Sequence, residues 1–321
     1  PQDMKIMRLA IASLAVSAAA PAAAAEPAPP VYSIVFENDW FGGTDNRYTN
    51  GIKHQWVSAE GKGERLARYL LRAGDGATVR YGVGAGQSIF TPETIRAAAP
   101  LPDQRPYAGW LYLETQSVVE RRSGATDILR ITAGVVGPAS LAEDAQRTLH
   151  RTFDFVDPAG WDNQLRNEPG LVVSFDRRWR AGLGDHAELS PHAGVSLGNV
   201  LTEARAGAIF RIGSNLRGDG LPARVSPARP AAGAHGREGY SWQAYVGGQV
   251  RAVAQNIFLD GNSFRDSLSV GKKPVVGEIE VGFALRAKRV SLGYNHVLRT
   301  KEYDSEPDAQ DFGAVTLSAA F

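Results

Sequence analysis

Long segments in which apolar and polar residues alternate with a period of two dominate the chain after its N-terminal stretch. A clear example is a set of apolar residues separated by single polar or small residues: Ile279, Val281, Phe283 and Leu285. This period is the signature of a β-strand, because successive side chains of a strand point to opposite sides. The apolar face is either buried in a soluble sandwich or presented to lipid by a membrane barrel.

Twelve such segments can be recognised, most of them near the roughly 9–11 residues that a tilted strand needs to cross a membrane. We place them at residues 31–38, 48–57, 79–89, 109–120, 127–136, 170–180, 187–197, 206–213, 241–251, 277–286, 289–298 and 312–321. The last one stops at Phe321, which resembles the assembly signal of bacterial outer-membrane barrels. Bacterial barrels also have an even number of strands. The fold expected is all-β, a twelve-stranded antiparallel transmembrane β-barrel of the bacterial outer membrane.

The N-terminal stretch has the features of a secretory signal peptide. Two basic residues precede an apolar stretch at 9–20, and a run of alanines follows at 22–25. An uncleaved anchor would need about 20 apolar residues. We therefore expect a signal peptide at residues 1–25 and one barrel domain at residues 26–321.

Composition excludes several classes of function. The net charge is only +1, which gives no electrostatic basis for binding nucleic acid. Cysteine is absent, so thiolate catalysis and cysteine-ligated metals are excluded. The sequence contains neither a Gly-x-Ser-x-Gly elbow nor a His-Glu-x-x-His zinc motif.

The connections should differ between the two ends of the barrel. If both chain ends lie in the periplasm, the outward connections are 39–47, 90–108, 137–169, 198–205, 252–276 and 299–311, and most are long. Long outside and short inside is the usual asymmetry of such barrels. Two inward connections are also long. We expect a short interfacial helix in 58–78 and, because it is rich in Pro, Arg and Ala, a mobile loop at 214–240.

The first outward connection and the adjacent strand ends are rich in oxygen ligands. They include Asn38, Asp39, Asp45 and Thr49. Carboxylate and amide oxygens this close together suit a hard cation such as calcium, which takes six to eight oxygen ligands. The alternative is a hairpin loop in which Asn and Asp cap the turn.

The second outward connection contains Arg105, followed by several aromatic residues. Arg105 could clamp a phosphate group, or it could form an internal salt bridge with Asp103. Tyr107, Trp110 and Tyr112 are expected to belong to an interfacial aromatic girdle.

The third outward connection predicts a helix, so the barrel should carry a helical extracellular loop. Ser140 and Glu143 have the spacing of a capping box, with a helix continuing to about residue 151. Gln146 and His150 are four residues apart and therefore share one helical face. A histidine there could act as a general base, because its pKa lies near neutrality. The alternative is a surface histidine on an amphipathic turn.

Six motifs in order resemble the lipid A 3′-O-deacylase family of outer-membrane proteins. They are Glu37-Asn-Asp-x-Phe, Thr44-Asp-x-x-Tyr-Thr-Asn-Gly51, Gln87-x-x-Phe-Thr-Pro92, Arg105-Pro-Tyr-Ala-Gly-Trp110, Gln146-x-x-x-His150 and Gly160-Trp-Asp-x-Gln-x-x-Asn-Glu-Pro169. The similarity spans almost the whole barrel domain and is densest between residues 37 and 169.

The resemblance implies a twelve-stranded barrel that hydrolyses, with Ca²⁺, the 3′-O-linked acyloxyacyl group of lipid A in the outer leaflet. The partners implied are lipid A, as part of lipopolysaccharide, and the surrounding outer-membrane lipids. The site residues carried over are Asn38, Asp39, Thr49, Gln146 and His150. A basic residue after the Thr-Pro run corresponds to Arg96.

One family position is not matched. The family has an acidic residue about six positions after its histidine, where this chain has Val156. Asp154 or Asp157 would then have to supply that carboxylate as a metal ligand beside Asp39.

The roles expected from the resemblance form one hydrolytic mechanism. Asp39 holds the calcium ion, and Asn38 donates a hydrogen bond to the developing oxyanion. His150 takes a proton from the attacking water, oriented by Gln146 or a carboxylate, while Thr49 assists through its hydroxyl. Arg96 and Arg105 meet the phosphates of lipid A. Two other functions remain open: an outer-membrane phospholipase and a transport barrel.

Overall fold

The structure is a computed structural model that describes residues 28–43, 47–61, 69–216, 219–225, 229 and 239–321. The signal peptide expected at residues 1–25 lies outside these described residues. No helix within the described ranges is long and apolar enough to cross a membrane.

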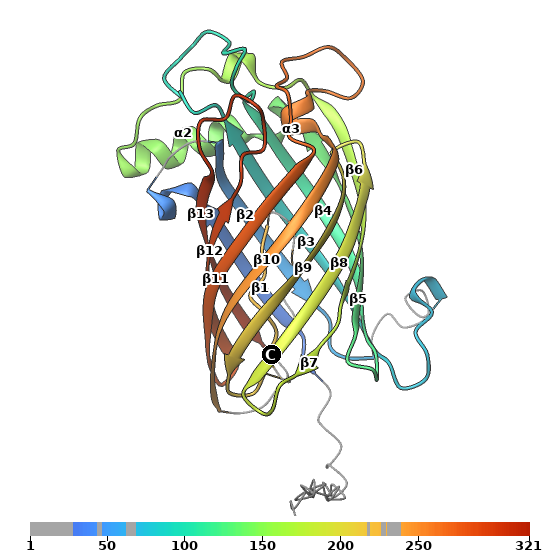
Figure 1. Ribbon diagram of the computed structural model, residues 1–321. Coiled ribbons are helices and arrows are strands. Elements are labelled where there is room, and N and C mark those ends of the chain that lie inside the picture. Colours follow the sequence, from blue (N-terminus) through green and yellow to red (C-terminus); the bar gives the residue numbers. More distant parts are fainter. Residues whose placement is uncertain (1–27, 44–46, 62–68, 217–218, 226–228, 230–238) are drawn as a thin grey trace, which may run out of the picture.

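The described residues form a closed antiparallel barrel (Figure 1). Its long strands are β1 (Val31–Asn38), β2 (Arg47–Val57), β3 (Thr78–Thr91), β4 (Ala108–Glu120), β5 (Thr126–Val136), β6 (Glu168–Arg178), β8 (Ala187–Gly198), β9 (Leu201–Gly213), β10 (Tyr240–Asn256), β11 (Val275–Ala287), β12 (Val290–Arg299) and β13 (Gln310–Ala320). A two-residue strand, β7 (Ala181–Gly182), pairs with β8. The barrel closes because β1 pairs with β13 and β6 pairs with β8. The predicted twelve-stranded barrel is confirmed.

The two faces of the wall settle which kind of β-fold this is. On β11, Val281 is 48% exposed, whereas its neighbour Glu280 is 7% exposed. The same alternation runs along most strands, with apolar side chains outside and charged ones inside. A soluble sandwich would bury its apolar face instead, so this arrangement is that of a membrane barrel.

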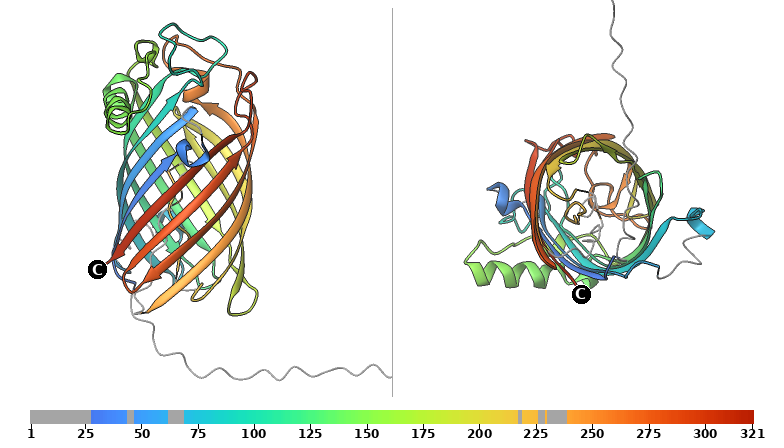
Figure 2. Two further views of the ribbon diagram at one scale, coloured as in Figure 1. Left: turned by 90° about the vertical axis from the view of Figure 1, so that its left-hand side faces the viewer. Right: turned by 90° about the horizontal axis from the view of Figure 1, so that it is seen from below.

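Apart from the helical residues 69–71, which lie toward the other end, the helices gather at the end of the barrel opposite the C-terminus (Figures 1 and 2). They are η1 (Asp39–Gly42), η2 (Pro138–Ser140), α2 (Ala142–Phe153), η3 (Trp161–Asn163) and α3 (Ile257–Asp260). The helical loop predicted between the fifth and sixth strands is therefore present as α2.

The connection predicted at 198–205 is wrong, because it contains only residues 199–200. The Thr202 hydroxyl donates to the Gly198 carbonyl at 2.9 Å and closes a tight turn, so β9 begins earlier than expected. At the other end, residues 69–71 of the expected interfacial helix are helical, and residues 62–68 lie outside the description.

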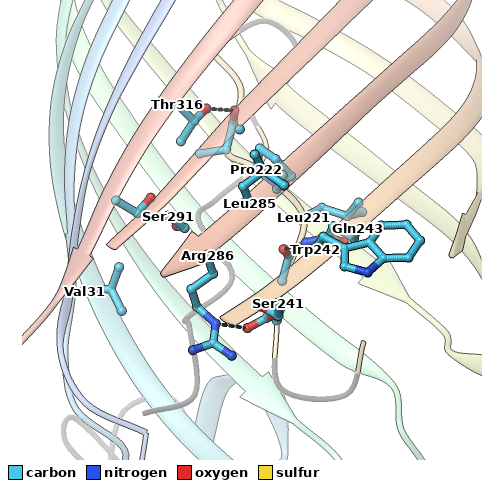
Figure 3. Close-up of a pocket in the computed structure, with 16 residues that line it drawn as sticks. Val31, Leu221, Pro222, Ser241, Trp242, Gln243, Leu285, Arg286, Ser291 and Thr316 are labelled. Carbon is cyan, nitrogen blue, oxygen red and sulfur yellow. Dashed lines mark hydrogen bonds and ion pairs between the residues drawn. The ribbon is translucent and has the colours of Figure 1, made fainter. Parts of the chain in front are cut away.

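The segment between β9 and β10 was expected to be a mobile loop, and this prediction is wrong for its described part. Residues 219–225 are packed inside the barrel (Figures 2 and 3). Lys53 Nζ donates to the Arg224 carbonyl at 2.9 Å, and the Val225 amide donates to Glu37 at 2.7 Å. Thr316 donates to the Ala223 carbonyl at 3.0 Å. We call residues 219–225 together with Arg229 the plug.

The polar lumen explains why the plug enters it. Glu280 faces the lumen and pairs with Arg229 at 2.7 Å, while Arg286 pairs with Asp219 at 2.8 Å. Buried carboxylates are tolerated only when they are paired and hydrogen-bonded, and the plug supplies these partners. Side chains and plug together occupy much of the lumen, and the cavities left among the described residues are small.

A filled lumen leads to a clear expectation for conductance. Protein reconstituted in planar bilayers should give no steady ohmic conductance, because ion pairs and the plug occupy the path. A porin measured in the same bilayers is the control. Stable channels that persist in repeated insertions would contradict this and would favour the transport function.

Candidate active site

Helix α2 lies outside the barrel, against the outer surface of β3 and β4 (Figure 2). Gln87, which faces outward from β3, donates to the Ser140 carbonyl at 2.6 Å. Ile89 is buried in a cluster with Tyr107, Ala142 and Trp161. The wall and the third outward connection therefore share a small core outside the barrel.

A glycine permits this close approach. A Cβ on Gly109 would lie 2.1 Å from Ser140 Oγ and 2.2 Å from Ala142 Cβ. Real atoms never come so close, so only glycine allows η2 and the start of α2 to rest on β4. The Gly137 amide also donates to the Gly109 carbonyl at 3.0 Å.

The capping box predicted for this helix is wrong. Ser140 belongs to η2, and the residue that precedes α2 is Leu141, in the left-handed conformation and without a side-chain cap. The Ser140 hydroxyl is instead buried at the contact with Gly109. Packing against the wall has taken the place of capping.

The predicted shared face of α2 is confirmed. Ala142, Gln146 and His150 are its buried residues. His150 is only 3% exposed, so the alternative of a surface histidine is wrong. Its ring contacts the edge of Phe155 at 5.7 Å between centroids.

The ring of His150 is oriented by a backbone carbonyl. His150 Nδ1 donates to the carbonyl of Val156. A carbonyl can only accept, so Nδ1 carries the proton and Nε2 is the basic nitrogen of the neutral ring. The chain reaches this position because α2 ends at Asp154 in the left-handed conformation and turns back, with the Phe155 amide donating to the His150 carbonyl at 2.8 Å.

At the position where the acidic residue is missing, the backbone and not the side chain contacts His150. Val156, where the family has an acidic residue, supplies its carbonyl to the histidine. Asp154 and Asp157 are both exposed, and Asp157 pairs with Arg147 at 3.5 Å. Among the described residues neither carboxylate forms a hydrogen bond or ion pair with Asp39 or His150, and the role of either one as a metal ligand stays a prediction.

Because the backbone of residue 156 makes the contact with His150, the activity should depend little on the side chain at that position. Val156→Ala is expected to keep kcat within about twofold of wild type, because the carbonyl that binds Nδ1 remains. Steady-state kinetics on the purified protein would measure this. A loss of tenfold or more would mean that the side chain, not the carbonyl, positions His150.

Gln146 does not orient the histidine. Its Oε1 accepts a hydrogen bond from Trp161 Nε1 at 2.8 Å, which ties α2 to η3. Its Nε2 is buried, and no acceptor for it exists among the residues described. The Gln146 side chain thus places an amide N–H donor on the buried face of α2.

Three predicted site residues surround the first connection. Asn38 ends β1, Asp39 begins η1 and Thr49 lies in β2. Asn38 Oδ1 accepts from the Trp40 amide at 2.7 Å, so Asn38 caps η1, as the turn-capping alternative proposed. This contact uses the oxygen of the amide and leaves Nδ2 as a donor. Asp39 is buried in the first turn of η1.

Thr49 lies on a bulge of β2. The pairing of β2 with β3 shifts between Tyr48 and Asn50, which leaves Thr49 unmatched in the ladder. Its hydroxyl shares a hydrogen bond with the hydroxyl of Thr91 at 2.8 Å. Bulges re-aim side chains in this way and are common beside active sites.

Calcium fits the described residues only in part. Asp39 offers a buried carboxylate of the kind calcium prefers. Within the described ranges, however, no three His, Cys, Asp or Glu side chains form a group that could hold a metal. Asp45 of the same connection lies outside the described residues.

The two arginines expected to bind phosphate have different positions. Arg96 is exposed, one residue after Ile95, whose carbonyl accepts from Tyr107. Arg105 is fully buried, stacked over the Phe90 ring at 4.8 Å and paired with Glu302 at 3.3 Å. It therefore forms an internal salt bridge, with Glu302 rather than Asp103, and does not share the outer surface with His150.

The electrostatics of Glu302 agree with this pairing. Burial alone would raise its pKa, but Arg299 and Arg105 more than offset burial, so the pKa of Glu302 lies below its ordinary value. The aromatic girdle predicted nearby is also wrong. Tyr107 is buried behind α2, while Trp110 and Tyr112 face the lumen from β4.

Several residues that build the site were not predicted. Gly109, Trp161 and the Val156 carbonyl each position the buried face of α2. Gly109 and Trp161 lie within two of the motifs given above, but the role of a backbone carbonyl has no signal in side-chain identity.

Comparison with known proteins places the chain in a family. The model of the family described as "Outer membrane protein LpxR" matches residues 9–321. Among solved structures, LpxR from Salmonella typhimurium is 16% identical, with a TM-score of 0.75 over 91% of this chain and 100% of that one. The β domain of the Bordetella autotransporter BrkA is 11% identical, with a TM-score of 0.50 over 91% and 99%. No curated protein is matched in sequence. Since the family model covers nearly the whole chain, this protein is a member of the LpxR family of outer membrane proteins.

Proposed function

We propose that the protein is a lipid A 3′-O-deacylase, a carboxylic ester hydrolase that removes the acyloxyacyl group at that position. The observation that carries this proposal is the location of His150, buried between α2 and the outer surface of the barrel wall with Nδ1 held by the Val156 carbonyl. A site on the membrane side of the wall suits a lipid, which reaches it by lateral diffusion without entering the filled lumen. We place the α2 end of the barrel toward the outer leaflet, where lipid A lies.

His150 is the general base in this proposal. With Nδ1 protonated, Nε2 is the nitrogen that takes a proton from a water molecule that attacks the ester carbonyl. The proton then passes to the leaving alkoxide. Fixing the ring by a carbonyl keeps Nε2 basic and aimed without a change of tautomer.

Two amide donors can stabilise the negative charge that develops on the ester oxygen. Asn38 has its Oδ1 committed to Trp40, which leaves Nδ2 to donate. Gln146 has its Oε1 committed to Trp161, which leaves Nε2 to donate. A donor of this kind typically contributes about 3 kcal/mol to the transition state. Thr49 is assigned a supporting hydroxyl hydrogen bond.

Calcium is the cofactor that we propose for the site, with Asp39 as its carboxylate ligand. When bound, it would polarise the ester carbonyl as a Lewis acid. Because Asp154 and Asp157 are exposed, we assign the remaining ligand positions to backbone oxygens, water and substrate oxygens, which calcium accepts readily.

Removing calcium should therefore stop the reaction. EDTA, or the change Asp39→Asn, is expected to lower the deacylation rate at least 100-fold, and excess calcium should restore the activity lost to EDTA alone. Asp157→Asn is the matched control and should retain activity. Release of fatty acid from purified lipid A measures all three. Full activity in EDTA would remove the metal from this proposal.

Arg96 is the residue that we propose to meet a phosphate of lipid A, since it is exposed beside the loop that packs on α2. Arg105 does not suit that role, because it would have to leave Glu302 and the barrel interior. A phospholipase would share the same base and ester chemistry and would differ only in its product.

A further inference from the structure

A second polar site lies inside the barrel, away from His150. It is a cavity of about 60 Å³ in the half of the lumen nearer the short turns. Side chains from β6, β8, β9, β10 and β11 line it together with Arg224 and Arg229 of the plug. A single water needs about 10–15 Å³ of such space, so the cavity has room for a few waters or one small polyatomic ion.

Positive charge exceeds negative charge around this cavity. Its described lining contains five arginines, one histidine and only two carboxylates, Asp176 and Glu280. One of the arginines, Arg177, turns away and is bound by Asp127. Four guanidinium groups and two carboxylates therefore face the cavity. Two of these arginines, Arg205 and Arg224, also pair outside its lining, with Glu203 at 2.9 Å and Glu278 at 3.6 Å.

Both carboxylates already have arginine partners. Asp176 accepts from Arg205 Nε at 2.9 Å, and Glu280 pairs with Arg229 at 2.7 Å. Arg224 lies farther from Glu280, at 3.7 Å. Both carboxylates thus have their closest ion pairs with arginines other than Arg178.

Arg178 is the lining arginine for which the described residues provide no ion-pair partner. Among the residues that the structure describes, its side chain forms no hydrogen bond and no ion pair. It ends β6 and is in register with His192 of β8, so the two side chains share the lumen face. His192 Nδ1 is also buried without a hydrogen-bond partner in the described chain. A guanidinium that is only partly exposed and has no ion-pair partner costs free energy, and a bound anion would lower that cost.

We propose that this cavity binds a tetrahedral oxyanion, inorganic phosphate or sulfate, between the wall and the plug. Arg178 and His192 would hold it from the wall, and Arg224 and Arg229 from the plug. Planar guanidinium groups match the oxygens of such an ion by paired hydrogen bonds, which a chloride ion cannot reproduce. The ion would fasten the plug inside the barrel, and this role is independent of the deacylase reaction.

The test is the thermal stability of the full protein in detergent, free of lipid, in phosphate and in chloride of equal ionic strength. The melting temperature of wild type should rise with phosphate concentration and stay constant in chloride, because only the folded state has the site. Phosphorus NMR should show broadening of the phosphate signal by wild type.

Variants separate this site from general salt effects. Arg178→Gln should bind phosphate at least tenfold more weakly and lose the phosphate-dependent shift, while in chloride it should be at least as stable as wild type. Arg286→Gln, which changes a lumen arginine paired with Asp219, is the control and should keep the shift. If Arg178→Gln does not fold, Arg178→Lys should fold and bind phosphate more weakly.

Two results would overturn the proposal. One is a wild-type melting temperature that responds equally to phosphate and chloride. The other is an Arg178 variant that retains the wild-type phosphate shift.

Discussion

Replacing His150 with alanine should lower the deacylation rate by roughly 10²–10⁴-fold, the usual contribution of a positioned general base. The buried ring is held by the Val156 carbonyl with Nε2 as its basic nitrogen, and no other histidine of the described chain packs on α2. The barrel itself should be unaffected, because the residue lies outside the wall. Initial rates of fatty acid release from lipid A in mixed micelles would give the ratio.

His54→Ala is the matched control for this change. His54 also faces outward from the wall, on β2, but its Nδ1 is hydrogen-bonded to the Tyr32 hydroxyl at 2.6 Å and not to the third connection. Its loss should leave the rate within about twofold of wild type. Equal rates for wild type and His150→Ala would exclude the general base assigned here.

The second large effect is expected from Gly109→Ala. The new methyl group would overlap Ser140 Oγ and Ala142 Cβ, which stand 2.1 and 2.2 Å from its position. Helix α2 must then move away from β4, and His150 moves with it. A displacement of about 1 Å at a catalytic group can cost on the order of 100-fold in rate. Kinetics of the folded variant, checked by heat-modifiable migration in gels, would measure the loss.

Gly248→Ala provides the control for the second change. Gly248 is also a strand glycine, but a Cβ there comes no closer than 3.6 Å to any atom, at the Glu278 carbonyl. This variant should fold and retain its activity. Full activity in Gly109→Ala would show that the position of α2 on the wall does not limit the reaction.

The fold could be predicted from the sequence because both faces of a membrane barrel constrain the alternation of apolar and polar residues. Lipid requires an apolar residue at every second position, and the enclosed lumen requires polar residues at the others. The run around Glu280 and Val281 shows both, and the structure places them inside and outside as expected. Strand ends were less predictable, since the tight turn before β9 is held by local contacts such as the hydrogen bond from the Thr202 hydroxyl to the Gly198 carbonyl.

The plug could not be predicted, for a physical reason. Proline and arginine in a connection are typical of a mobile loop when the segment is considered alone. What draws the plug inside is the set of carboxylates that face the lumen from distant strands, such as Glu280 and Glu37, and the plug residues that contact them are brought there only by the closed barrel.

The candidate site was predictable where side-chain spacing decides it. Gln146 and His150 share a buried face because helical geometry places residues four apart together. The group that orients His150 was not predictable. Every residue has a backbone carbonyl, and the turn at Asp154 is what brings the Val156 carbonyl to the ring. The sequence also left the role of Arg105 open, because its ion-pair partner Glu302 lies on the distant β12–β13 connection.

The most direct test of the proposed function is mass spectrometry of lipid A and phospholipids from Gram-negative cells that express this protein, with calcium present and beside cells that express His150→Ala. The proposal predicts that wild-type cells lose the mass of the 3′-O-linked acyloxyacyl group from lipid A, while phospholipids and the variant's lipid A stay unchanged. Intact lipid A in wild-type cells that accumulate lysophospholipids would contradict it and would identify a phospholipase instead.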